Sequence, residues 1–319
     1  MENTEARITD IHVQDGGIQL PERDWLNQTV FLKVNIKTTF LGKFFQPRLD
    51  IQSGDSSVTQ VNQVNQYFEH GAKGVRYINI SSLSLAQKGA DIQLDGKYVS
   101  LDDQTAQLAT FTDQDLNNKN ILIISPHPDD AEIAAYGLYS DHKQSYIITV
   151  TAGDSGEYTY DEIYDNETEH YLKKGEVRTW NSITVPLLGG IPPEQSVNLG
   201  FFDSTLKRMF TNKPRAVSPV FAKNSDRNTY KRINISSLNH GLSEESDWES
   251  LVHDFHYLLT EINPSIIITP YPALDSHPDH KFSSLALFEA IKKSDFRGGY
   301  LYLYSNYLSL NEYFPYGKE

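Results

Sequence analysis

Three apolar runs constrain the fold of the second part of this chain most strongly. ILIIS (121–125), SYIITVTAG (145–153) and PSIIITP (264–270) are almost continuously hydrophobic. Such runs are typical of strands that are buried on both faces of a parallel sheet. Segments with helical periodicity lie between or after these strands, at 131–140, around 165–183, 246–262 and 280–293. A further strand is predicted last, at 300–305. Because strands and helices alternate, we predict an α/β domain with a mostly parallel sheet flanked by helices.

The first part of the chain has a different pattern. Apolar and polar side chains alternate in TVFLKVNIKTTF (29–40), RLDIQ (48–52) and VRYINIS (75–81), with turn residues between these segments. A period of two is typical of half-buried strands, so we predict a smaller, β-rich, sandwich-like domain. Its role could be packing or oligomerisation, carbohydrate binding or covering the site, and packing is the favoured interpretation.

We place the boundary near residue 118, with a β-rich accessory domain at 1–118 and the α/β domain at 119–319. The polar near-repeat TQVNQVNQ (59–66) is interpreted as a loop, and the polar segment 101–120 as the linker.

Composition excludes several classes of protein. The 319 residues include 28 basic and 42 acidic ones, a net charge of −14, which argues against a nucleic-acid partner. No run approaches the roughly 18 apolar residues of a membrane span. The N-terminus lacks the apolar core of a secretory signal, so we expect a cytoplasmic protein. The absence of cysteine excludes disulfides, thiolate metal sites and a cysteine nucleophile. The oligomeric state stays open.

Two segments carry candidate chemistry, SPHPDDAE (125–132) and DSHPDH (275–280). Each follows a predicted buried strand and leads into a helix, and ligands bind at the carboxyl ends of strands in open α/β sheets. His127, Asp130 and His280 would supply two imidazoles and one carboxylate to a metal and leave positions open for water. One such segment alone could be a turn that caps a helix. Two of them favour a metal or acid–base site.

The neighbouring residues suggest the remaining roles. Asp129 could take a proton from a metal-activated water. His277 could stabilise an oxyanion as an imidazolium and then protonate the leaving amine. Asp279 could orient His277 through a hydrogen bond.

HPDDAEI together with the downstream SHPDHKF resembles the PIG-L/LmbE-like zinc-dependent N-deacetylases, which remove acetyl groups from N-acetylglucosamine conjugates. The resemblance covers about residues 120–305 and implies a Rossmann-like domain that binds zinc (Zn²⁺). Segments similar to the family's lie at 150–157, 172–180 and 198–204. Ala131 stands where the family often has Glu, and Glu132 follows. The resemblance implies the same assignment: His127, Asp130 and His280 as metal ligands, Asp129 as general base, His277 as oxyanion stabiliser, and Asp279 as its partner.

Other residues are candidates for substrate binding. A basic residue near Arg178 helps hold the substrate in the family, although a solvated helix face is the competing interpretation. Asp203 could bind sugar hydroxyls, and Asp154 could line the rim of the site. The stretch 207–232 holds eight basic residues and one acidic residue. It could be a solvated loop or could bind the phosphates of an anionic substrate.

These observations predict a metal-dependent hydrolase that removes the N-acetyl group of an N-acetylated amino sugar. The sugar would belong to a larger, possibly phosphate-bearing glycan, such as lipopolysaccharide or a sugar-lipid. Two histidines and one carboxylate also match the triad of non-haem Fe²⁺ oxygenases, so an oxygenase is one alternative. A sugar-binding protein without catalysis on the same fold is the other.

Overall fold

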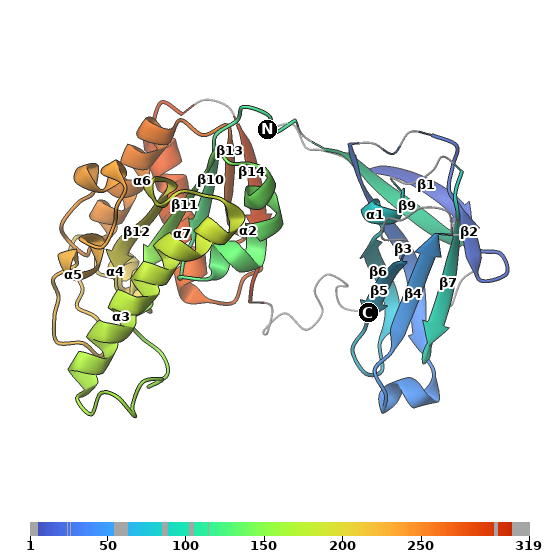
Figure 1. The fold of residues 1–319 in the computed structure, drawn as a ribbon, viewed down its shortest axis with the longest axis horizontal. Helices are drawn as coiled ribbons and strands as arrows, with labels where there is room; N and C mark the ends of the chain where they lie inside the picture. Colours follow the sequence, from blue (N-terminus) through green and yellow to red (C-terminus); the bar gives the residue numbers. More distant parts are fainter. Residues whose placement is uncertain are drawn as a thin grey trace. The chain divides into compact units, whose positions relative to one another are not determined.

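The computed structural model describes residues 6–23, 25, 27–53, 63–84, 89–101, 105–113, 115–296 and 299–307. The chain divides into two compact units, and the second begins at Leu116. Figure 1 draws both units. The predicted fold class is confirmed, with antiparallel β structure first and a parallel α/β sheet after it.

The N-terminal unit contains two antiparallel sheets (Figure 1). One has the strand order β1-β9-β3-β6, with β8 also paired to β3, and the other has the order β2-β7-β4-β5. Their bounds are β1 Arg7–His12, β2 Gly17–Gln19, β3 Gln28–Thr38, β4 Arg48–Ser53, β5 Gln63–Tyr67, β6 Lys73–Asn79, β7 Asp91–Lys97, β8 Val99–Leu101 and β9 Thr105–Thr112. A 3₁₀ turn, η1 (Phe40–Lys43), and one helical turn, α1 (Ser81–Ser84), lie between strands.

The alternation of buried and more exposed side chains along the strands explains the core of this unit. Every second residue of β3, from Val30 to Ile36, is buried. These side chains share one hydrophobic cluster with Leu49 and Ile51 of β4 and Ile92 of β7, which belong to the other sheet. The two sheets therefore pack face to face as a sandwich.

Two predictions for this unit are wrong. The segment 101–120 is not simply a linker, because β9 within it pairs with both β1 and β3 and buries Ala106 and Leu108. The segment 59–66 is not simply a loop, because β5 begins at Gln63 and pairs with β4. Residues 59–62 and 102–104 lie outside the described part of the chain.

The second unit is built on a five-stranded parallel sheet of order β12-β11-β10-β13-β14. The strands are β10 Ile121–Ser125, β11 Ser145–Thr151, β12 Ser196–Phe201, β13 Ile266–Pro270 and β14 Tyr300–Tyr304. The helices are α2 Asp130–Asp141, α3 Glu167–Thr184, α4 Leu206–Thr211, α5 Asn228–Lys231, α6 Trp248–Ile262 and α7 Pro278–Lys293, with 3₁₀ turns η2 Val185–Gly189, η3 Pro193–Gln195 and η4 Ser237–Gly241. No helix in the described ranges is both long and apolar enough to span a bilayer.

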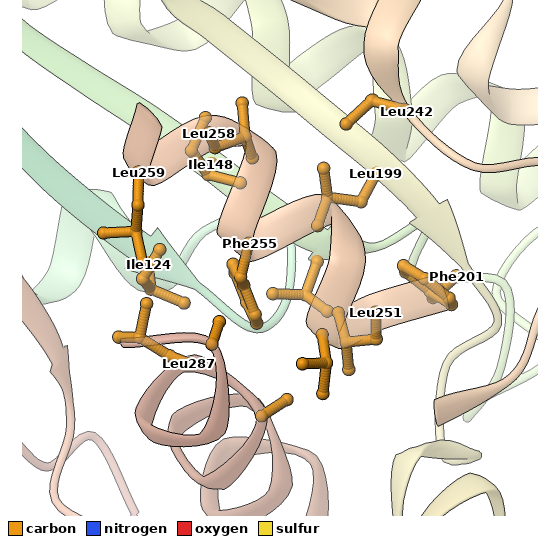
Figure 2. Close-up of a cluster of buried hydrophobic side chains, with 14 of the residues drawn as sticks. Ile124, Ile148, Leu199, Phe201, Leu242, Leu251, Phe255, Leu258, Leu259 and Leu287 are labelled. Carbon is orange, nitrogen blue, oxygen red and sulfur yellow. The ribbon is translucent and has the colours of Figure 1, made fainter. Parts of the chain in front are cut away.

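Burial on both faces explains why the strand sequences are continuously apolar. Figure 2 shows one face, where Leu251 and Phe255 of α6 and Leu287 of α7 lie against the sheet. Ile124 of β10 points into this cluster. Ile123, the preceding residue in β10, belongs to a separate cluster with side chains of α2.

Two of the eight basic residues in the stretch 207–232, Arg227 and Lys231, are structural and do not fit the phosphate-binding interpretation, whereas the other six are exposed. Arg227 is fully buried, pairs with the buried Asp254, donates from Nε to Leu199 O (2.7 Å) and lies 3.7 Å from the centre of the Phe201 ring. Lys231 is also buried and donates to the carbonyl of Ser243 at 2.5 Å. A buried cation needs such partners, so these two charges belong to the core and are not available to a substrate.

Candidate metal and catalytic site

The two motifs meet at the carboxyl ends of neighbouring strands. The first follows β10 and the second follows β13, and these strands pair in parallel. The strand order reverses between them, since β11 and β12 lie on one side of β10 while β13 and β14 lie on the other. Such a switch point is where open α/β sheets form their ligand sites.

Three potential ligand atoms converge there. His127 Nδ1 lies 3.2 Å from Asp130 Oδ2 and 3.2 Å from His280 Nε2, and His280 Nε2 lies 3.0 Å from Asp130 Oδ2. Donor atoms about 2.0–2.1 Å from a tetrahedral zinc ion are about 3.3 Å from one another. All three side chains are buried. Their spacing and donor chemistry therefore fit a bound divalent metal.

Other side chains fix two of these ligands. His280 Nδ1 lies 2.9 Å from Asp275 Oδ2, which places the ring proton at Nδ1 and leaves the lone pair of Nε2 facing the shared point. Asp130 Oδ2 accepts the backbone N–H of His127 (2.9 Å), and its Oδ1 accepts from Asn306 Nδ2 (2.8 Å). Hydrogen bonds and charges from the two histidines outweigh burial and hold the pKa of Asp130 well below its usual range.

The other ring nitrogen of His127 faces two carboxylates. Its Nε2 lies 3.4 Å from Asp203 Oδ1 and 3.4 Å from Asp279 Oδ2. If Nδ1 ligates a metal, the proton is on Nε2, which both carboxylates approach although neither forms a hydrogen bond with it in this structure. A carboxylate behind a ligating imidazole is a common support for metal sites. Asp203, predicted to bind sugar hydroxyls, thus lies behind His127.

Asp279 contacts His277 through a hydrogen bond, but the donor is its backbone N–H and not its carboxylate. The Asp279 carboxylate accepts the backbone N–H groups of Ser204 (2.6 Å) and Leu206 (3.2 Å). What reaches His277 is the backbone N–H of Asp279, which donates to Nδ1 at 3.2 Å.

The hydrogen bond from the Asp279 backbone N–H to His277 Nδ1 decides which tautomer of His277 the site favours. Because Nδ1 accepts a hydrogen bond, the neutral ring carries its proton on Nε2 and can donate it. Burial and the nearby His127 lower the pKa of His277. The arrangement therefore favours a neutral donor over the predicted imidazolium.

Asp129 and Arg178 form a pair beside these residues. Asp129 precedes α2 with φ 155°, and its side chain is 52% exposed. Arg178 Nη2 lies 3.3 Å from Asp129 Oδ2 and donates to Pro128 O (3.1 Å). Gly153 leaves room for this guanidinium, since a Cβ there would lie 2.4 Å from Arg178 Nε. Partial burial raises the pKa of Asp129, and Arg178 opposes that rise.

Asp154 is not at the rim as predicted but is buried after β11. Its Oδ1 accepts the backbone N–H of Asp203 at 2.8 Å, which links β11 to the loop behind His127. Burial raises the pKa of Asp154 to about 7.

The raised pKa predicts a pH dependence of stability. The folded value of about 7 exceeds the ordinary value of 3.8, so the protonated carboxyl stabilises the fold below about pH 4 and this contribution is lost as pH rises to 7. Between pH 4.5 and 7, the free energy of unfolding of the wild type should fall by about 3 kcal/mol relative to Asp154→Asn. Urea denaturation of both proteins across this range measures the difference, and a difference independent of pH would contradict the assignment.

Three residues of this site have no role predicted from the sequence. Asp275 orients His280, Asn306 holds Asp130, and the Tyr307 ring centre lies 5.4 Å from that of His277. Asn306 and Tyr307 follow β14, and their position after a predicted strand could have identified them as candidate site residues. No spacing rule links Asp275 to a histidine five residues later.

The sequence matches the PIG-L family profile, described as GlcNAc-PI de-N-acetylase, over residues 122–291, which is just over half of the chain. No curated protein gives a significant match. Among solved structures, the conserved protein TT1542 from Thermus thermophilus is similar at 19% identity and a TM-score of 0.35, covering 59% of this chain and 67% of that one. GalB, the 4-carboxy-2-hydroxymuconate hydratase from Pseudomonas putida, is similar at 14% identity and a TM-score of 0.35, covering 57% and 62%.

Proposed function

Since the chain belongs to the PIG-L family of GlcNAc-PI de-N-acetylases, which are deacetylases of the hydrolase class, we propose that it is a metal-dependent N-deacetylase acting on an N-acetylhexosamine. The observation that carries this proposal is the convergence of His127 Nδ1, Asp130 Oδ2 and His280 Nε2 at mutual distances of 3.0–3.2 Å.

These three residues would hold the metal, and zinc is the expected ion. When bound, zinc lowers the pKa of a water molecule and polarises an amide carbonyl. The same donor set suits Fe²⁺, so the proposal does not depend on one metal. Asp275 would keep the His280 imidazole in the tautomer that ligation needs, and Asp279 and Asp203 place two carboxylates near Nε2 of His127.

The remaining residues would move protons and stabilise charge. Asp129 accepts the proton of the attacking water, and Arg178 holds that carboxylate in place. His277 donates from Nε2 to the amide oxygen as negative charge develops there. The proton held by Asp129 would then pass to the nitrogen as the C–N bond breaks, so that the amine leaves and acetate is the other product.

The substrate is proposed to be an N-acetylhexosamine unit of a larger glycan, such as a sugar-lipid. An anionic substrate has fewer partners than the sequence suggested, because Arg227 and Lys231 are buried. Exposed cations that could meet an anionic group include Lys207, Arg215 and Lys223.

The proposal is tested by incubating zinc-loaded protein with N-acetylglucosamine conjugates. Acetate release, with an equal amount of free amine and no oxygen consumption, is the expected result. Oxygen consumption would instead identify an oxygenase. Conjugate binding without acetate release, by protein shown to hold zinc, would identify a sugar-binding protein. A chelator-treated sample is the control for adventitious hydrolysis.

A further inference from the structure

One end of the N-terminal sandwich exposes four large apolar side chains. Phe40, Leu41, Phe44 and Phe45 are 73%, 48%, 66% and 53% exposed. They lie in and directly after η1, which connects β3 to β4, and we call them the aromatic tip. The rings of Phe40 and Phe44 are 5.5 Å apart, and Phe45 stacks on Tyr98 at 5.4 Å. Contiguous exposed apolar side chains of this kind mark interaction sites.

The backbone beneath the aromatic tip is firmly held. Gly42 donates its N–H to Thr39 O (3.0 Å) and accepts from Gly71 N (3.1 Å), while Thr39 N–H donates to Tyr98 O (3.0 Å). A Cβ on Gly42 would lie 2.4 Å from Tyr98 O. Gly42 is therefore packed against the neighbouring turns, and the side chains on either side of it are left facing outward.

Four lysines lie at the same end of the sandwich as the aromatic tip. Lys37 and Lys73 face each other across β3 and β6, and Lys97 ends β7 opposite Arg48 of β4. These positions lie at the same end of the sandwich as η1, which itself ends at Lys43. All four lysines are exposed.

Among the described residues at this end, two acidic side chains have basic partners. Glu69 pairs with Arg76, and Asp50 pairs with Arg48. Asp95 lies two residues before Lys97 along β7. In a chain of net charge −14, a lysine-rich end of this kind departs from the average surface.

We propose that the aromatic tip docks this protein onto an anionic lipid surface. Phenylalanine and leucine side chains carry no hydrogen-bonding group, so they gain free energy on entering the acyl region of a bilayer. The four lysines can meet the lipid phosphates, each adding electrostatic attraction near an anionic surface. A soluble sugar fits less well, because the four side chains offer no hydrogen-bond partner to its hydroxyl groups, and the lysines at this end favour an anionic lipid surface over an uncharged protein surface.

The test is co-sedimentation of the full chain with vesicles. Vesicles of phosphatidylcholine alone are compared with vesicles that also contain phosphatidylglycerol. The wild type should bind the anionic vesicles, and Phe40→Ser/Phe44→Ser should bind at least tenfold more weakly. Ile163→Ser/Leu188→Ser is the matched control, because these side chains are 71% and 79% exposed in the other unit. This control should bind within twofold of the wild type.

The charge contribution has its own readout. Lys43→Glu/Lys97→Glu should weaken binding, and wild-type binding should fall as salt is added. Equal binding by the wild type and the phenylalanine variant would overturn the proposal. So would a wild type that ignores both kinds of vesicle but self-associates or binds soluble oligosaccharide through Phe40 and Phe44. The assay needs neither metal nor turnover, so its outcome is independent of whether the protein is a deacetylase.

Discussion

Replacing Asp129 with Asn is expected to lower the turnover number of deacetylation by about 10²–10⁴ while the metal content stays unchanged. An amide of the same shape can still accept a hydrogen bond from Arg178, but it cannot take a proton from water. Asp129 supplies none of the three converging ligand atoms, so the variant is expected to retain its metal. Acetate release and metal analysis on the same preparations measure both quantities.

The pH profile gives a second readout of this role. Partial burial raises the pKa of Asp129, so wild-type kcat/KM should fall on the acid side at a pH above that expected for an ordinary aspartate. Arg178 lowers the pKa of Asp129, so Arg178→Gln should move this acid limb to higher pH.

Two outcomes would contradict the assignment. If Asp129→Asn loses the metal, the roles of Asp129 and Asp130 are exchanged. If Asp129→Asn retains wild-type turnover, another group accepts the proton.

The sequence predicted features that depend on local pattern. ILIIS could be recognised as a buried strand because both of its faces are covered by helices. The two motifs could be placed at one edge of the sheet because parallel strands end together. The sequence does not reveal the strand β9 because the polar Thr110 is also buried, so the apolar alternation of Ala106 and Leu108 does not continue.

What the sequence could not predict depends on partners far along the chain. Arg227 resembles a surface charge until Asp254, 27 residues later, is seen to neutralise it. The Asp279 carboxylate is adjacent in sequence to the metal ligand His280, but it accepts hydrogen bonds from the loop after β12. The motif supplied the residue types, and the tertiary contacts decided which atom of each faces the metal position.

Replacing His280 with Ala is expected to abolish stoichiometric metal binding, because it removes one of three converging ligand atoms. Asp275→Asn should weaken binding by about 10–100-fold, since it removes the acceptor that keeps the His280 proton on Nδ1. Metal content after dialysis and calorimetric titration with zinc measure both effects.

Two other groups of residues in the site could hold a metal, and the same measurements separate them. These groups are His127 with His277 and His280, and His127 with Asp203 and Asp279. The first would make His277→Ala lose its metal, whereas we expect that variant to keep it and lose activity. The second would make Asp203→Asn lose its metal outright and Asp130→Asn keep it. We expect the reverse, because Asp130 Oδ2 lies within 3.2 Å of both histidine donors, while Asp203 faces the opposite nitrogen of His127.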